Sequence, residues 1–483
     1  MKLLAQHSSA PAIAGDFADP TIISDGKLYY AAGTSSEWAP HYPVFRSSDL
    51  QHWEQSGYIF DHAPEWTMSS FWAPEFFKTG SRYLVYYTAR RKSDSVSCIG
   101  VASSAFPDHG YTDHGVIIDF GKEAIDAFVF DDDGQLFISF KAYGLDKRPI
   151  ELLAYKLSSD GLHLEGDPFT LIRDEQRAGL EGQSMIKKDG YYYLFYSAGN
   201  CCGASCSYNV QVARARNIKG PYERHVGDPL LSEYIGWKCA GHGSFINNTE
   251  GDTYYVHHAY SVIDGIYTGR QGMIAKLEWN QQAGWPLFKT NFKPSPALPV
   301  GFADDFSGKK PALYWQWDWR HSTPHISQAN GKLLLKGTVA PMNPTGIVIT
   351  IRPAQTTFSV TTEVTPVAHA LCGIAYYGDA SAAVGVGVSD GKVQCWMTKE
   401  NQFTVVKEIM YPGKDFIEFK MQVEPRHEVI FYYRVKRGEW NVVNEKAMSI
   451  DFLPQWDRSP RPGLHVKGDN PSGIFGSFSI SYK

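Results

Sequence analysis

The stretch from Ala178 to Ala198 reads AGLEGQSMIKKDGYYYLFYSA. It holds a carboxylate, Glu181, then a short β-prone run, the dipeptide Asp189-Gly190 and an aromatic run. Asp-Gly between two β-prone runs is the strongest short-range signal for a hairpin. The stretch therefore predicts two antiparallel strands joined by a tight turn.

This hairpin unit recurs along the N-terminal part of the chain. Its turn glycines stand at positions 26, 80, 134, 190 and 251, so the spacings are 54, 54, 56 and 61 residues. A second pair of strand-like segments follows each hairpin, as at Cys98–Ala102 and Asn209–Ala213. Four strands per unit at a period of this size predict a β-propeller. We expect five blades within residues 1–296.

The pattern changes after the proline-rich segment 292–301, FKPSPALPVG, which has the composition of a linker. Beyond it come many short alternating strands, such as Lys332–Leu335 and Phe358–Val364. Such strands with turn signals between them predict an antiparallel β-sandwich of jelly-roll (concanavalin-like) type. The predicted fold class is therefore all-β, with a five-bladed β-propeller in residues 1–296 and a β-sandwich accessory domain in residues 297–483.

Charge and hydropathy restrict the partners of the chain. Its 483 residues carry a net charge of −5 without a run of like charges, which argues against nucleic acid as a partner. No stretch approaches the ~18 apolar residues that a membrane span requires. We expect an oligosaccharide or polysaccharide substrate, no nucleic acid and no membrane, and we leave the oligomeric state open. Because residues 1–10 are too polar after Ala5 for a secretory leader, we expect a cytoplasmic protein, or a periplasmic or secreted one if a leader was trimmed.

The chain has seven cysteines, and three of them cluster at Cys201, Cys202 and Cys206. A zinc site would need Cys239 or a distant histidine, because no second pair has the spacing of zinc ligands. We expect structural or incidental thiols here, in preference to a loop disulfide or a zinc site.

An ionisable residue opens the first strand of every repeat: Asp19, Glu75, Asp126, Glu181 and His242. The first strand of a propeller blade lines the central channel, so these residues are predicted to form a ring at one mouth of it. A buried charge without a partner is costly, and so we expect this ring to be the functional site. Hydrolysis of a glycosidic bond needs two carboxyl groups, about 6.5–9.5 Å apart in inverting enzymes and about 5 Å apart in retaining ones. Carboxyl groups on facing blades of a propeller are expected to have the wider separation, which favours the inverting mechanism.

The sequence resembles glycoside hydrolase family 43 over the whole predicted propeller. The motifs that carry the resemblance are FADP (17–20), WAPE (72–75), ID (125–126), LEG (180–182), GHGS (241–244) and GRQ (269–271). They occur in the order that the family has them. The C-terminal region resembles the accessory sandwich that many members carry.

The resemblance implies a role for several residues. Asp19 would be the general base that activates water, Glu181 the general acid, and Asp126 the carboxylate that raises the pKa of Glu181 and orients it. His242 would face the channel, where members often hold a structural Ca²⁺ or another ion, largely through water. The chemistry itself would require no cofactor. Arg270 would hydrogen-bond the sugar at the cleavage subsite.

The roles of two further residues in these motifs, Trp72 and Glu75, are left open. Trp72 is expected either to stack on a sugar or to pack within its blade, and Glu75 either to contact substrate or to serve the structure. The sequence departs from the family at Ala127 and Gln183, where a proline is usual. These changes bear on strand entry and subsite shape rather than on the catalytic groups.

The predicted function is that of an inverting exo-glycosidase of polysaccharide degradation that releases a terminal pentose. We favour an α-L-arabinofuranosidase over a β-1,4-xylosidase or a β-galactofuranosidase of the same family. A non-catalytic glycan-binding propeller is a different class, and it would not need all three carboxylates. A retaining fructan-active propeller would carry Asn-Asp-Pro-Asn-Gly and Glu-Cys motifs, which the sequence lacks.

Overall fold

A computed structural model describes residues 10–143, 148–227, 229–280, 282–290, 299–413 and 415–483. The regular elements among these residues are strands, apart from one 3₁₀ turn, η1 (Gly265–Tyr267). In the described ranges we find no helix with the length and apolar character to cross a membrane. The chain divides into two compact units: residues 1–36, 40–265 and 269–297, and residues 37–39, 266–268 and 298–483. The predicted boundary at 296 and most of the predicted linker fall on residues 291–298, outside the described ranges.

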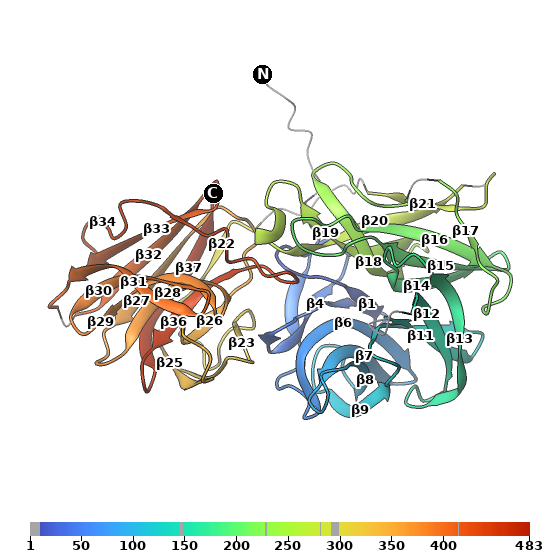
Figure 1. Cartoon of the computed structure of the whole chain (residues 1–483), viewed down its shortest axis with the longest axis horizontal. Coiled ribbons are helices and arrows are strands. Elements are labelled where there is room, and N and C mark those ends of the chain that lie inside the picture. The colour runs from blue at the N-terminus through green and yellow to red at the C-terminus, as the bar shows by residue number, and fades with distance from the viewer. Residues whose placement is uncertain (1–9, 144–147, 228, 281, 291–298, 414) are drawn as a thin grey trace, which may run out of the picture. The chain divides into compact units, whose positions relative to one another are not determined.

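The first unit consists of five four-stranded antiparallel sheets, coloured blue to yellow-green in Figure 1. Blade one contains β1 (Thr21–Ser24), β2 (Tyr29–Ala32), β4 (His41–Ser47) and β5 (Glu54–Phe60). Blade two contains β6 (Thr67–Thr79), β7 (Arg82–Arg91), β8 (Ser97–Ser104) and β9 (Thr112–Ile118). Blade three contains β10 (Ala124–Asp132), β11 (Gln135–Ala142), β12 (Ile150–Leu157) and β13 (Leu164–Asp174). Blade four contains β14 (Glu181–Lys188), β15 (Tyr191–Ala198), β16 (Asn209–Ala215) and β17 (Glu223–Arg224), and blade five contains β18 (Trp237–Asn247), β19 (Thr253–Ser261), β20 (Arg270–Trp279) and β21 (Pro286–Lys289).

The blades close into a ring. The innermost strands contact one another in the order β1, β6, β10, β14 and β18, and β18 contacts β1 in turn. The segment before β1 also joins the last blade: Ile13 forms a β-bridge with Gly272, and the Phe17 N–H donates to the Arg270 carbonyl at 2.6 Å. The predicted five-bladed propeller is therefore confirmed.

The hairpin turns explain why the repeat is visible in the sequence. The glycines at positions 26, 80, 134, 190 and 251 all have left-handed backbones, with φ between 59° and 97°. Such angles are readily adopted by glycine and cost most other residues strain. The spacing of these glycines in the sequence therefore equals the number of residues from one blade to the next.

A second left-handed residue stands within or just before each innermost strand: Asp19, Ala73, Asp126, Gly182 and His242, with φ between 40° and 58°. In blades two to five the strand pairing shifts across this residue, which is the signature of a β-bulge. The bulge residues are the equivalent positions of the five blades. Two of the five residues predicted to be equivalent are therefore not at equivalent positions. Glu181 lies one residue before the bulge residue of its blade, and Glu75 lies two residues after the bulge residue of its blade. An alternating pattern of side chains does not reveal a bulge.

Because of this register, Glu75 lies deeper in the channel and not at its mouth. Its Oε2 accepts hydrogen bonds from Thr21 Oγ1 at 2.8 Å and from Ser244 Oγ at 3.3 Å, so it links β1, β6 and β18. Burial raises the pKa of Glu75 to about 8, against the opposing effect of its hydrogen bonds from Thr21, the backbone of Val129 and Ser244. Of the two roles expected for Glu75, this position favours the structural one.

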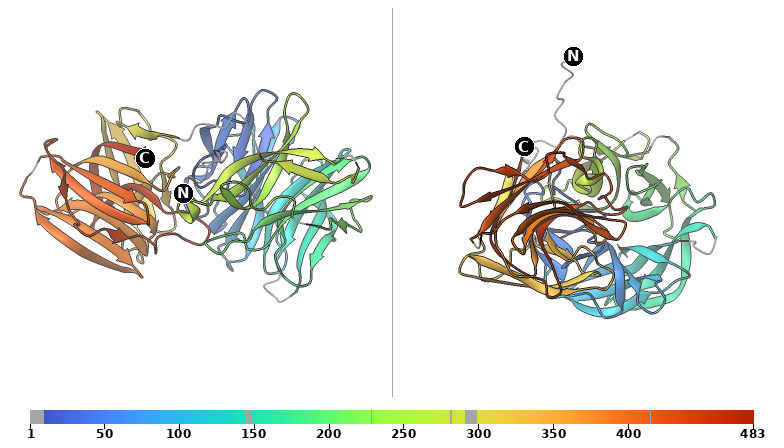
Figure 2. Two further views of the ribbon diagram at one scale, coloured as in Figure 1. Left: turned by 90° about the horizontal axis from the view of Figure 1, so that it is seen from above. Right: turned by 60° about the vertical axis from the view of Figure 1, so that its left-hand side comes forward.

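The second unit contains two antiparallel sheets, drawn in gold to red in Figures 1 and 2. One follows the order β24 (Ser322–Ala329), β25 (Lys332–Val339), β37 (Ser472–Tyr482), β27 (Phe358–Thr365), β32 (Ile417–Glu424), β33 (Glu428–Val435) and β34 (Asn441–Val442), with β22 (Gly301–Asp304) on β37 and β35 (Met448–Ser449) on β33. The other follows the order β3 (Trp38–Ala39), β23 (Gln316–Asp318), β26 (Ile347–Thr350), β36 (Arg461–Lys467), β28 (Leu371–Asp379), β29 (Ala382–Ser389), β30 (Lys392–Lys399) and β31 (Gln402–Met410). Strictly alternate residues of β27 and β32 are buried, as in a sheet with one face on a core. This agrees with the predicted β-sandwich.

Glu75 should make the stability of the protein depend on pH. Its raised pKa gives a contribution to stability that is complete below about pH 4.5 and is lost as the pH rises towards 8. Glutamine is neutral at every pH and keeps a carbonyl acceptor for Thr21. We therefore expect Glu75→Gln to flatten the fall of Tm between pH 5 and pH 8, as measured by differential scanning fluorimetry across buffers.

The exposed carboxyl of Glu54, which pairs with Arg46 on blade one, provides a matched control. Glu54→Gln should keep the wild-type slope of Tm against pH. Identical slopes for wild type and Glu75→Gln would contradict the account of Glu75.

Candidate active site

Asp19 lies in a cluster of polar and cationic groups from blades one and five. Thr34 Oγ1 donates to its Oδ2 at 2.7 Å, and the Arg270 guanidinium donates to its Oδ1 at 2.9 Å. The Nδ1 atoms of His258 and His242 lie 3.2 Å and 3.4 Å from the same Oδ1. Burial alone would raise the pKa of Asp19, but Arg270 and the two histidines outweigh it and hold the pKa well below its usual range. Asp19 is therefore ionised at any working pH.

Glu181, the first residue of β14, has a donor on each carboxyl oxygen. The Lys141 ammonium, from β11, donates to Oε2, and the Tyr208 hydroxyl donates to Oε1 at 2.9 Å. The side chains of Lys141 and Glu181 are only 9% and 17% exposed. Burial would raise the pKa of Glu181, but the adjacent Lys141 charge outweighs burial and lowers the pKa. The free site therefore holds Glu181 as a carboxylate.

Asp126 is the third carboxylate of the cluster. Its Oδ2 accepts from the Gly182 N–H at 3.2 Å, and its own N–H donates to Thr88 Oγ1 at 3.1 Å. Burial raises the pKa of Asp126 to about 6; Glu181 adds to the rise, and His242 and Lys141 oppose it. The expectation that Asp126 raises the pKa of Glu181 is thus corrected for the free site, where Asp126 has the raised pKa and Glu181 the lowered one. Lys141 is the physical reason.

Lys141 and Tyr208 were missed from the sequence. Lys141 is the one charged residue in the otherwise apolar or small run Leu136–Ala142, and that isolation is a signal that it has a buried partner. Tyr208 follows the cysteine cluster and carries no comparable signal. Neither partner of Glu181 is near it in sequence: the packing of blades three and four brings Lys141 to it, and the strand pairing within blade four brings Tyr208.

Gln183 and Ala127, the two departures from the family pattern, lie beside these groups. The Gln183 amide donates to the Asp126 carbonyl at 2.6 Å and to Ser139 Oγ at 3.2 Å. Both Gln183 and Ala127 are buried. Gln183 thus links the entry of β14 to the entry of β10.

His242 turns its Nδ1 towards two carboxylates. This nitrogen lies 3.4 Å from Asp19 Oδ1 and 4.0 Å from Asp126 Oδ2, and the His242 N–H donates to Ser197 Oγ at 2.8 Å. Among the described residues, no group of three or more His, Cys, Asp or Glu side chains could hold a metal ion. A Ca²⁺ ion at His242 stays a prediction, and no chemical step depends on it.

Arg270 and Trp72 were both expected to contact substrate. Arg270 is buried and binds Asp19, so it acts on the expected base directly, and its contact with a sugar stays a prediction. Trp72 is partly exposed and precedes the bulge residue Ala73, in the same register as Glu181. The Arg90 guanidinium lies 5.8 Å from the centre of its indole ring. The register places Trp72 near the mouth, where stacking on a sugar stays a prediction.

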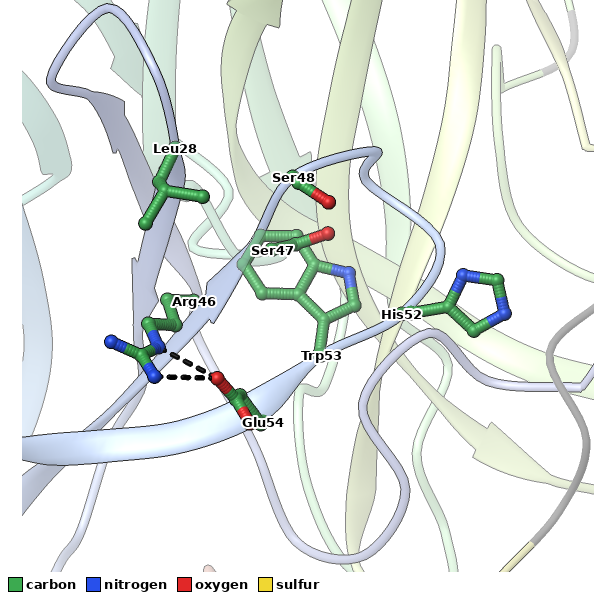
Figure 3. Close-up of a pocket in the computed structure, with 7 residues that line it drawn as sticks. All are labelled: Leu28, Arg46, Ser47, Ser48, His52, Trp53 and Glu54. Carbon is green, nitrogen blue, oxygen red and sulfur yellow. Dashed lines mark hydrogen bonds and ion pairs between the residues drawn. The ribbon is translucent and has the colours of Figure 1, made fainter.

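A pocket of about 470 Å³ opens elsewhere, on blade one. Figure 3 shows its lining residues, Leu28, Arg46, Ser47, Ser48, His52, Trp53 and Glu54. Most of their polar groups already have partners within the blade: for example, the Trp53 indole N–H donates to the Leu50 carbonyl at 3.0 Å, and Arg46 pairs with Glu54 at 2.7 Å. None of the expected catalytic residues lines this pocket, so we assign the chemistry to the carboxylate cluster.

The expectation of thiols at Cys201, Cys202 and Cys206 was wrong, because all three are in disulfides. Cys201 is bonded to Cys202, and Cys206 is bonded to Cys239, whereas Cys98, Cys372 and Cys395 are free and buried. Cys239 stands 33 residues from Cys206 but lies in β18, and the packing of blades four and five brings the two sulfurs together. Sequence spacing does not reveal a pairing of this kind.

Comparison with known proteins gives matches for both units. The family model "Glycosyl hydrolases family 43" matches residues 8–286, and the model "Beta xylosidase C-terminal Concanavalin A-like domain" matches residues 303–456. The extracellular exo-α-(1→5)-L-arabinofuranosidase ArbA of Cellvibrio japonicus is 27% identical over 311 residues, which cover 56% of this chain and 86% of that protein. The xylan 1,3-β-xylosidase of a Vibrio species is 25% identical over 335 residues, 60% of each protein. The crystal structure of a xylan β-1,4-xylosidase from Bacillus halodurans C-125 has a TM-score of 0.83 at 20% identity and covers 98% of this chain and 99% of that one, which shows a common fold.

Removal of the Lys141 charge should change the pH dependence of catalysis. In Lys141→Met the pKa of Glu181 loses its main lowering influence, so it rises. We expect the basic limb of the kcat/KM profile, which reports the acid of the free enzyme, to move to higher pH by about 1–3 pH units. The measurement is the rate of hydrolysis of a natural oligosaccharide substrate, whose leaving group must be protonated by the acid, between pH 4 and pH 10. Lys141→Arg keeps the cation and should keep the limb; a limb unmoved in Lys141→Met would contradict the assignment.

Proposed function

Because the chain belongs to glycoside hydrolase family 43, we propose that Asp19, Asp126 and Glu181 hydrolyse a terminal glycosidic bond with inversion at the anomeric carbon. That the protein is a glycoside hydrolase follows from its family and its relatives. The observation that supports the proposed roles of these three residues is the environment of their carboxylates. Three of them, from blades one, three and four, meet around His242 and the Gly182 N–H, and one of them is held permanently ionised by Arg270.

In this proposal Asp19 is the general base. As the anomeric C–O bond breaks, a water oxygen bonds to the anomeric carbon and the water gives a proton to Asp19. Arg270, His258 and His242 orient Asp19 through contacts of 2.9–3.4 Å to its Oδ1. Because these contacts keep Asp19 ionised, the base is available over the whole pH range in which the acid works.

Glu181 is the general acid in the same proposal and gives its proton to the leaving oxygen. Lys141 opposes protonation of Glu181, so the ion pair between them has to weaken when substrate occupies the site. Asp126, with a pKa of about 6, is the neighbouring carboxyl whose negative charge favours a protonated Glu181 once that ion pair weakens.

The substrate that we propose is a terminal α-L-arabinofuranose of an oligosaccharide or polysaccharide. The Cellvibrio relative, whose name gives that activity, supports it. The C-terminal domain model and the Vibrio relative carry β-xylosidase names, and so a β-xylosidase is the second candidate. We expect nitrophenyl α-L-arabinofuranoside to give a higher kcat/KM than the β-xyloside or the β-galactofuranoside. A preference for either of the other two would replace the sugar and leave the mechanism untouched.

We also propose a periplasmic or secreted location, in place of the cytoplasmic one expected from the sequence. Two disulfides persist in an oxidising compartment and are rare in the cytosol. The Cellvibrio relative is named as extracellular.

The two catalytic roles predict different responses to the leaving group. Glu181→Gln should abolish hydrolysis of natural glycans, whose alkoxide leaving group must be protonated, but spare much of the activity on a nitrophenyl glycoside, whose leaving group needs little acid. Asp19→Asn should be severe on both, because water needs a base whatever the leaving group. Single-substrate kinetics on an arabino-oligosaccharide and a nitrophenyl arabinofuranoside check this.

Asp126→Asn provides the comparison within the same cluster. Its main effect should be a shift of the acidic and basic limbs of the pH profile rather than a complete loss of activity. The reason is that Asp126 influences Asp19 and Glu181 and takes no direct part in either proton transfer. Equal losses for Glu181→Gln and Asp19→Asn on activated and natural substrates would contradict the division of acid and base.

A further inference from the structure

Tyr208 contacts groups on both sides of the catalytic cluster. Its hydroxyl donates to Glu181 Oε1 at 2.9 Å, and its ring lies parallel to the His258 imidazole, with an interplanar angle of 1° and centroids 5.6 Å apart. His258 Nδ1 in turn accepts the Asp19 N–H at 3.0 Å. One fully buried side chain thus touches the proposed acid and the histidine that holds the proposed base.

The position of Tyr208 is fixed from β18, the innermost strand of blade five. A Cβ added to Gly241 of β18 would lie 2.5 Å from Tyr208 Cδ1, so the tyrosine ring packs directly on the backbone of that strand. The same strand contains Cys239, whose disulfide with Cys206 ends two residues before Tyr208. The segment that carries Tyr208 is therefore held to β18 by a covalent bond and by close packing.

The second disulfide of this loop, Cys201–Cys202, does not connect the loop to another strand. Cys201 and Cys202 are neighbours in sequence, so their bond closes a small ring and joins no second strand. Cys206 and Cys239 are 33 residues apart, and their bond connects the loop after β15 with β18. The chain thus offers a matched pair: one disulfide that constrains Tyr208 and one nearby that does not.

We propose that Tyr208 is a positioning residue that sets the Glu181 carboxyl against Asp19, and that the Cys206–Cys239 disulfide holds Tyr208 in place, so that the rate of hydrolysis depends on this bond. The proposal rests on the role proposed above for Glu181. It adds two elements that the carboxylate chemistry does not require: a tyrosine on the acid, and a covalent bond that fixes the loop bearing it.

Reduction of this bond is a two-electron step. Dithiothreitol supplies two electrons and two protons, the Cys206–Cys239 S–S bond breaks to give two thiols, and dithiothreitol is oxidised to its cyclic disulfide. The loop then keeps only its non-covalent contacts with β18, and Tyr208 is free to leave Glu181. Because the propeller is held by its blades, we expect the fold to survive this reduction.

Tyr208→Phe tests the first half of the proposal. It removes one hydrogen bond to a charged group and keeps the ring, so kcat should fall about tenfold to hundredfold while KM stays within about twofold. The fall should be larger on a natural arabino-oligosaccharide than on a nitrophenyl arabinofuranoside, because the lost contact is with the acid. An unchanged kcat on both substrates overturns the positioning role.

Cys206→Ser/Cys239→Ser tests the second half, with Cys201→Ser/Cys202→Ser as its control. The first variant should lose kcat to the extent of Tyr208→Phe, with Tm still above the assay temperature, and the control should keep wild-type rates. Dithiothreitol should lower kcat in wild type and in the control, and should have no effect on Cys206→Ser/Cys239→Ser. If that variant does not fold, reduction of the folded control protein gives the same comparison. Undiminished activity in the folded variant or in the reduced control overturns the proposal.

A combined variant, Cys206→Ser/Cys239→Ser/Tyr208→Phe, decides whether the disulfide acts through the tyrosine. Groups that act as one unit give non-additive losses, so the combined variant should be no slower than the slower of its two parents. Losses that multiply would show separate effects and overturn the proposal. A failure of the Glu181 assignment is distinguished by Glu181→Gln itself, which would then lose activity equally on natural and activated substrates.

Discussion

A carboxylate that is buried at the mouth of a propeller channel stays ionised only if cations or N–H donors surround it, because transfer of a charge out of water is costly. Asp19 meets this condition through Arg270 and the imidazole of His242, and Glu181 meets it through Lys141, to which the Tyr208 hydroxyl adds a hydrogen bond. These partners come from different blades, so the charge cluster exists only when the ring is closed. The pKa values, the orientation of the carboxyls and the loop that carries Tyr208 all depend on that closure.

The same environment separates the three carboxyls by their pKa values. Arg270 holds Asp19 ionised, Lys141 lowers the pKa of Glu181, and burial leaves Asp126 with a pKa of about 6. Neighbouring carboxyls whose environments push their pKa values apart are how one site supplies both acid and base. In the free site the Lys141 ammonium contacts Glu181, the group that we propose as the acid. Substrate binding therefore has to alter the contact between Lys141 and Glu181, and this is a requirement that the carboxylates alone would not impose.

Much of the fold could be predicted because its signals are local. The turn glycines and the alternating strands mark the blades one by one, and the change of pattern after position 301 marks the sandwich. Asp19, Asp126 and Glu181 were singled out from their motifs, and their catalytic roles stay proposals. The register of Glu75 and Glu181 was not, because a bulge leaves no trace in an alternating pattern. Lys141, the Cys206–Cys239 bond and the order of the pKa values were missed for a related reason: each depends on residues that only blade packing brings together.

The central claim is that Asp19 and Glu181 act as base and acid on a water and a leaving oxygen, and not as nucleophile and acid. Proton NMR of the hydrolysis of a nitrophenyl α-L-arabinofuranoside, or of the preferred nitrophenyl glycoside if it is another sugar, tests this directly when spectra are taken before the free sugar mutarotates. The account predicts that the first-formed sugar has the anomeric configuration opposite to that of the substrate. A first-formed sugar with the configuration of the substrate would show a retaining enzyme and contradict the account.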